Sequence, residues 1–141
     1  MTAHPLVGTW RLVSFVVQDA DGGLEYPFGR DAEGFITYTA DGRMAVQFGG
    51  ANRPRLVVPD WVGGADAEIA AAARHYFAYC GTYEIQDATV VHHVEVSLMP
   101  NWMGGEQVRQ VALDGDTVTL STPPTLVAGR PQTGTLVWQR V

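Results

Sequence analysis

The sequence predicts an all-β fold, an eight-stranded antiparallel barrel with one helix inserted between strands three and four. Most of the 141-residue chain consists of short runs rich in β-branched and aromatic residues, separated by turn residues. A single segment has helical spacing, and a parallel α/β fold would need a helix for each crossover. Closing the sheet removes its edges, and eight strands enclose room for side chains or for one small ligand.

The expected strands are joined mostly by hairpins. The first run, GTWRLVSFVVQ, ends at the turn sequence DADGG, and Asp41-Gly42 separates the second strand from the third. Asp114-Gly115, between strands six and seven, is the strongest hairpin signal. The strands are expected at residues 8–18, 34–39, 43–49, 81–86, 89–98, 106–113, 116–122 and 134–141.

Residues 65–80, ADAEIAAAARHYFAYC, interrupt the strand pattern. The segment is rich in alanine and carries apolar residues at helical spacing. Asp66 and Glu68 lie near its start, where negative charge suits the helix dipole. The sequence therefore predicts a helix from about Asp66 to Tyr79, preceded by a loop rich in Pro and Gly at residues 50–64.

Composition and charge exclude several classes of protein. The formal charge is −6 and all nine basic residues are arginine, without the basic cluster that a nucleic-acid-binding surface needs. Cys80 is the single cysteine, so an internal disulfide is excluded. We see neither a signal peptide nor an apolar run of the roughly 20 residues that span a membrane. We expect one soluble, cytoplasmic domain over residues 1–141.

Titratable residues occur among the valines of residues 89–113, and strand register decides which way they point. Val118 and Leu120 alternate with polar residues, so they are expected to face the core. A two-residue turn at Asp114-Gly115 would place Val111 opposite Val118 and Arg109 opposite Leu120. Arg109 would then point into the barrel, together with Gln107 two positions earlier.

Carrying this register to the preceding strand requires an assumption about residues 99–105. If that connection closes symmetrically about Trp102, Glu95 lies opposite Arg109 and His93 opposite Val111. Glu95 and Arg109 would then form a buried ion pair, satisfied through two parallel hydrogen bonds. The sequence thus predicts a polar cluster of His93, Glu95, Gln107 and Arg109 inside the barrel.

The apolar pattern of residues 89–98 alone favours the opposite orientation. Val90, Val94 and Val96 share a face with His92, and this is the more apolar face. We give the Asp-Gly turn more weight, although one β-bulge would reverse the result. The valine row would then point outward, and we expect it to be covered by the helix or to form a homodimer contact.

Neither a metal nor a cofactor is expected. His92 and His93 are neighbours on a strand, so their side chains point to opposite faces and cannot hold one ion together. A site built from His93, Glu95 and the distant His75 is conceivable, but zinc usually requires three or four converging ligands. Cys80 ends an apolar face and is interpreted as a packed thiol.

Several phrases of the sequence resemble the lipocalin-like domain family of bacteria and fungi. They are GTWRLVSF, YPFG, GFITYTADGRMAVQ, HYFAYCGTYEI, VVHHVEVSLMPNWMGGEQVR and LSTPP, which span nearly the whole chain. Gly8-Thr9-Trp10 resembles the G-x-W signature of lipocalins, in which an arginine covers the tryptophan at the barrel floor, and Arg140 is the candidate here. The resemblance implies a barrel with a cavity. Relatives with such barrels include cyclases and isomerases of natural-product pathways.

We expect the barrel to bind a small, mostly apolar molecule that carries a carbonyl, hydroxyl or carboxylate. The alternative is a cofactor-independent cyclase or isomerase, in which His93 or Glu95 moves a proton and Arg109 stabilises a developing oxyanion. The candidate ligand-binding residues are His93, Glu95, Gln107 and Arg109 as polar groups, with Phe35, Met44, Phe48, Trp102, Val111 and Leu120 as the apolar wall.

Overall fold

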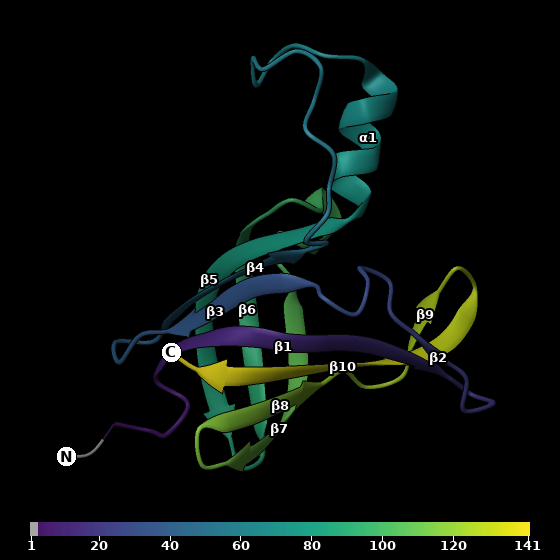
Figure 1. The fold of residues 1–141 in the computed structure, drawn as a ribbon. Coiled ribbons are helices and arrows are strands. Elements are labelled where there is room, and N and C mark those ends of the chain that lie inside the picture. The colour runs from purple at the N-terminus through teal and green to yellow at the C-terminus, as the bar shows by residue number, and fades with distance from the viewer. Residues whose placement is uncertain (1–2) are drawn as a thin grey trace.

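The first and last long strands, β1 (Gly8–Asp19) and β10 (Arg130–Arg140), pair with each other and close the sheet into a barrel (Figure 1). This computed structural model describes residues 3–141. Around the barrel the strand order is β1-β3-β4-β5-β6-β7-β8-β10, and all pairings are antiparallel. The remaining bounds are β3 (Glu33–Tyr38), β4 (Arg43–Gly49), β5 (Tyr76–Gln86), β6 (Thr89–Ser97), β7 (Glu106–Asp114) and β8 (Thr117–Ser121).

The predicted closed barrel of eight antiparallel strands is confirmed, with two short strands added. β2 (Leu24–Glu25) pairs with the end of β1, and β9 (Thr125–Val127) pairs with the start of β10. The short strand β2 lies in the chain before β3 and β4, so the helix follows the fourth strand rather than the third. The predicted place of the helix in the strand order was therefore wrong. It lies between β4 and β5, and a short 3-10 helix, η1 (Pro100–Trp102), connects β6 to β7.

The helix α1 (Asp66–Arg74) is shorter than predicted, because the residues expected to form its second half belong to β5. Phe77 pairs with Phe48 of β4, and Tyr79 pairs with Val46. Aromatic residues favour strands when a neighbouring strand is available for pairing. None of the helix residues is buried, and α1 with the loop before it projects from the barrel in Figure 1.

One end of the barrel is closed by Trp10, whose side chain is fully buried. The indole Nε1 donates a hydrogen bond to the Leu6 carbonyl at 2.9 Å. The guanidinium carbon of Arg140 lies 4.2 Å from the centre of the indole ring, and its Nη1 donates to the Val7 carbonyl. The predicted contact between Trp10 and Arg140 is confirmed, and it ties the first strand to the last.

A β-bulge at Glu95 reverses the alternation of inward and outward side chains in β6 beyond Val94. Cys80 pairs with Val96 but Gly81 pairs with Val94, which leaves Glu95 as the extra residue. A Cβ at Gly81 would lie 1.8 Å from the His93 carbonyl oxygen, so the close approach of the two strands requires glycine here.

The expected outward row of valines is wrong. Val90 and Val94 are buried in the core, and only Val96, beyond the bulge, is exposed. The exposed row of three valines, from which we had inferred a homodimer contact, is therefore not formed. No helix in residues 3–141 has the length and apolar character needed to cross a bilayer.

Replacing Trp10 by alanine is expected to destabilise the protein by about 3–5 kcal/mol, because it removes a buried aromatic side chain and leaves a cavity. Urea unfolding followed by circular dichroism measures this loss. Trp61→Ala is the matched control, since the Trp61 side chain is 91% exposed, and we expect a change of at most about 0.5 kcal/mol. Equal losses in the two variants would contradict the role of Trp10 at the closed end.

Candidate ligand-binding site

The inward orientation of β7 agrees with the sequence prediction. Leu113 pairs with Val118 and Val111 with Leu120, so the turn lies one residue later than expected. Each expected partner is displaced by two positions, and an even displacement keeps every side chain on the same face. Gln107 and Arg109 therefore face the interior.

The orientation of β6 is opposite to the prediction. Arg109 pairs with Val90 and Gln107 with His92, and His93, opposite Glu106, points outward. Arg109 was expected to lie opposite Glu95, which is five positions further along β6 than its actual partner Val90. An odd displacement turns each side chain to the other face. The cause is the connection through η1, which is not centred on Trp102 as we had assumed.

His93 and Glu95 accordingly lie on the outer surface. Glu95 forms an ion pair with Arg43 at 2.8 Å, with both side chains about half exposed. His93 lies 3.7 Å from Glu84 and 3.5 Å from Glu106. The predicted internal pair of Glu95 and Arg109 is wrong.

The barrel interior contains a cavity of about 340 Å³, near the lower end of the range typical of small-molecule sites, roughly 300–1,000 Å³. It lies between the core of the barrel and the hairpin of β9 and β10. Of the predicted site residues, those that line it are Phe48, Trp102, Gln107, Arg109 and Leu120.

Aromatic rings form much of the wall. Phe77 stacks on Trp102 with ring centres 5.3 Å apart. Phe15 and Phe48 meet edge to face at 5.3 Å, and Phe28 packs against both of them and against Phe77. A flat aromatic ligand would find stacking and edge-to-face partners in such a wall.

His92 is fully buried between two tyrosines. The Tyr38 hydroxyl lies 2.7 Å from Nε2 and the Tyr79 hydroxyl 2.6 Å from Nδ1. Burial, with smaller contributions from the positive charges of Arg109 and His93, lowers the pKa of His92 to about 3. The imidazole is therefore neutral at physiological pH, and one tyrosine donates to it while the other accepts from it.

Burial also raises the pKa of both tyrosines. For Tyr38 the neighbouring Tyr79 adds to the effect of burial, while the charge of Arg109 opposes it. For Tyr79 burial raises the pKa and Arg109 again lowers it. Both hydroxyls therefore keep their protons at neutral pH, which leaves Arg109 as the charged group in contact with the cavity.

Two polar groups on the cavity wall have unused hydrogen-bonding capacity. Arg109 donates to the Val108 carbonyl at 2.8 Å and to Gln107 Oε1 at 3.3 Å, but no carboxylate of residues 3–141 lies within 4.0 Å of its guanidinium. Trp138 Nε1 is buried and has no hydrogen-bond partner. Buried donors such as the Trp138 N–H are nearly always paired in folded proteins, whereas Arg109 is only partly buried and can donate its remaining N–H groups to water. Both groups are therefore candidates for contact with a ligand.

The remaining predicted wall residues lie elsewhere. Phe35 points outward beneath the guanidinium of Arg11, at 4.7 Å. Met44 is buried in the core and Val111 packs against the core, but neither residue lines the cavity. Sequence reasoning missed Tyr79, His92 and Trp138 as cavity residues. For His92 the signal was present in the apolar alternation of its own strand.

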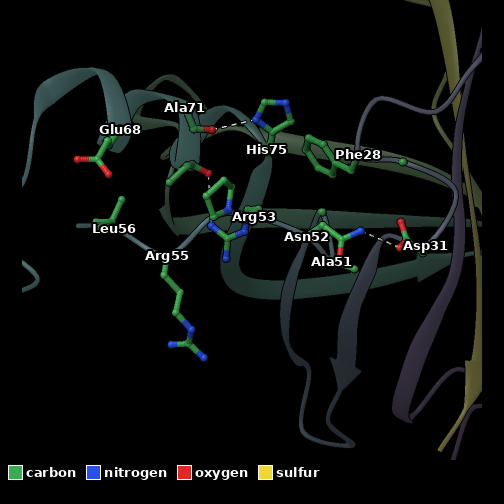
Figure 2. Close-up of a pocket in the computed structure, with 14 residues that line it drawn as sticks. Phe28, Asp31, Ala51, Asn52, Arg53, Arg55, Leu56, Glu68, Ala71 and His75 are labelled. Atoms are coloured by element: carbon green, nitrogen blue, oxygen red, sulfur yellow. Dashed lines mark hydrogen bonds between the residues drawn. The ribbon is translucent and has the colours of Figure 1, made fainter. Parts of the chain in front are cut away.

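A second hollow, of about 550 Å³, lies outside the barrel between α1 and residues 50–56 (Figure 2). Much of its polar lining is already engaged. Arg53 lies over the Tyr76 ring, Asn52 donates to Asp31 at 3.2 Å, and the ring of His75 lies 2.9 Å from the Ala71 carbonyl. The barrel interior, with its unpaired donors, is the better candidate site.

No group of three or more potential metal-ligating side chains occurs within residues 3–141. His75 lies at the end of α1, and His93 and Glu95 have the separate partners described above. The conceivable metal site of these three residues is therefore not formed.

His92 should make stability depend on pH. Its pKa is lowered in the folded protein, so below about pH 6.5 the unfolded chain takes up a proton that the folded protein does not. The stability from the neutral ring is present above that pH and is lost as the pH falls towards 3. Between pH 7 and pH 5 the loss is about 2 kcal/mol, and urea unfolding at both values should show it in the wild type but not in His92→Gln.

His93→Gln is the matched control, because it changes the adjacent histidine on the outer surface and leaves the buried ring intact. This variant should retain the loss of stability that His92 causes. If His92→Gln loses as much stability as the wild type between pH 7 and pH 5, His92 is not the buried neutral group described here.

Among the proteins that this chain resembles are a carrier protein and two proteins of known structure. The 4'-hydroxy-3'-methoxypropiophenone carrier protein ppsC of Aspergillus oryzae is 35% identical over 107 residues, which cover 70% of this chain and 96% of that protein. An uncharacterized protein from Bacteroides eggerthii is 14% identical, with a TM-score of 0.48 over 96% of this chain and 99% of that one. The lipoprotein YedD from Klebsiella pneumoniae is 11% identical, with a TM-score of 0.44 over 99% and 74%. The family model described as "Lipocalin-like domain" matches residues 7–141, and the chain belongs to this family.

Proposed function

We propose that this protein binds and carries a small aromatic molecule with oxygen substituents in its barrel cavity. The observation that carries the proposal is the cavity of about 340 Å³, whose aromatic wall includes the unpaired Trp138 N–H and the guanidinium of Arg109, which has further N–H groups to donate. Such a combination of apolar surface with a few polar groups is typical of small-molecule sites.

The size and lining of the cavity limit the ligand. A volume of about 340 Å³ lies near the lower end of the range for small-molecule sites and is ample for a single substituted ring. Phe77, Trp102 and Trp138 supply apolar contact, and Arg109 and Gln107 supply polar contact. A relative that is named as the carrier of an acylated phenol supports the same class of ligand for this chain.

The enzyme alternative has less support. His93 and Glu95, the residues expected to move a proton, lie outside the barrel. His92 replaces them inside, but both its ring nitrogens are engaged and its pKa of about 3 makes it a weak base. The described residues that line the cavity include neither Asp nor Glu. Carrying a ligand requires no proton transfer, so it agrees better with this lining.

A leucine at Gly134 should block binding. Gly134 lines the cavity, and a Cβ there would have its nearest neighbour, Thr122, at 3.5 Å, an ordinary contact distance. The rest of the leucine side chain would occupy ligand space. We expect Gly134→Leu to weaken binding of 4'-hydroxy-3'-methoxypropiophenone at least about tenfold, measured by calorimetric titration or by quenching of tryptophan fluorescence.

Thr135→Leu is the matched control, because the next residue of β10 points to the opposite face of the strand. It should bind like the wild type, and circular dichroism should show that both variants are folded. The proposal fails if the wild-type protein does not bind the compound, or if Gly134→Leu binds it unchanged.

A further inference from the structure

We propose that the cavity takes its ligand as an oxygen anion, the phenolate of an acidic phenol, which Arg109 holds. The phenol O–H bond breaks on binding, its proton goes to solvent, and the electron pair stays on the oxygen. This inference rests on the proposed function and adds the ionisation state of the ligand.

Charge balance inside the barrel favours an anion. Arg109 is the charged side chain among the described residues that line the cavity. The polar groups that contact Arg109 or feel its charge are Gln107 on its own strand, His92 on β6, and Tyr38 and Tyr79 on β3 and β5. All four are neutral, so the wall carries a net positive charge. A ligand that covers Arg109 removes it from water, and an opposite charge offsets the cost of doing so.

Arg109 keeps donors free for such a ligand. A guanidinium has five N–H groups, and two of them are used by the Val108 carbonyl and Gln107 Oε1. The bond to Gln107 also occupies the acceptor oxygen of that amide and holds the guanidinium in place. The other N–H groups have no acceptor among the described residues, and because Arg109 is only partly buried they are free to donate to water or to a ligand.

The histidine and tyrosine network supplies a further donor. In one tautomer Tyr38 donates to His92 Nε2, and Nδ1–H donates to the Tyr79 oxygen, at the observed distances of 2.7 and 2.6 Å. This arrangement leaves the Tyr79 hydrogen unused, and Tyr79 lines the cavity. The other tautomer would leave the unused hydrogen on Tyr38, which is almost fully buried and does not line the cavity. A buried hydrogen without an acceptor is costly, so the first tautomer is favoured.

After Arg109 and Tyr79, Trp138 is the third residue with a hydrogen-bond donor that is unused within the protein. Its side chain is 1% exposed, it lines the cavity, and its Nε1–H has no partner. An indole nitrogen can only donate. Arg109, Tyr79 and Trp138 thus all offer hydrogen-bond donors to the cavity. The cavity therefore suits a ligand that carries hydrogen-bond acceptors and a negative charge.

A phenolate suits these features better than a neutral phenol does. The aromatic wall receives the ring, and the charged oxygen accepts hydrogen bonds without bringing a donor of its own into a donor-rich site. A positive charge within about 4–6 Å of an acidic group lowers its pKa by roughly 1–3 units. An acyl group para to the hydroxyl withdraws electrons and makes ionisation easier still.

The test is an absorbance titration of 4'-hydroxy-3'-methoxypropiophenone with and without excess protein, because the phenolate absorbs at longer wavelength than the phenol. We expect the pKa of the bound compound to be at least about one unit lower than that of the free compound. Arg109→Met should abolish this shift, and Arg109→Lys, which keeps the charge, should retain part of it. The methyl ether of the same compound cannot ionise and should bind at least about tenfold more weakly to the wild-type protein at a pH above the pKa of the bound phenol.

The outcomes separate this inference from the proposed function. If the phenol and its methyl ether bind equally well and the bound phenol keeps its proton, the inference is overturned and ligand binding stands. If neither compound binds, both proposals fail. If Arg109→Met is folded and preserves the pKa shift, Arg109 does not hold the anion. The comparison of the two ligands with wild-type protein decides the ionisation state even if both variants fail to fold.

Discussion

Pairing of β1 with β10 is the constraint on which the rest of the structure depends. It joins the two ends of the sheet through Trp10–Arg140 and the residues beyond, so that the eight strands of the barrel have no free edge. Once the sheet is closed, alternate side chains of each strand must face either the interior or the surface. The lining of the cavity therefore depends on which of two neighbouring residues points inward. On β6 His92 faces the interior and His93 faces the surface.

The interior divides into a packed end and a hollow end. At the packed end Trp10 fills the barrel and is covered by Arg140. At the other end the side chains of Phe77 and Trp102 leave a cavity beside the hairpin of β9 and β10. Between these regions Tyr38 and Tyr79 satisfy both ring nitrogens of His92, so that this polar side chain is held in the core without charge. By contrast, Trp138 Nε1 has no partner, and Arg109 uses only two of its N–H groups within the protein. This difference separates structural polar groups from those available to a ligand.

The fold could be predicted because turns and alternation are local signals. The Asp114-Gly115 turn was displaced by one residue, but the inward face of Gln107 and Arg109 was correct because the parity survived. The length of α1 was overestimated, because Phe77 and Cys80 continue the helical spacing of the preceding residues, while Phe77 and Tyr79 also fit the alternation of a strand. Pairing with β4 decided for the strand.

The candidate site was predicted only in part, because it depends on the geometry of one connection. The position of His93 and Glu95 followed from an assumed symmetry of residues 99–105, which η1 does not obey. Their own strand carried the better signal, in the row of Val90, His92 and Val94. That row could not reveal the partners of His92, since Tyr38 and Tyr79 come from distant strands and meet it only in the closed barrel.

A crystal structure of the protein with a bound acylated phenol tests the central claim most directly. The ring is expected inside the barrel against Phe77 and Trp102, with its ionised oxygen within about 3 Å of the Arg109 guanidinium. A ligand that lies in the hollow between α1 and residues 50–56, with the barrel interior empty, would contradict the claim.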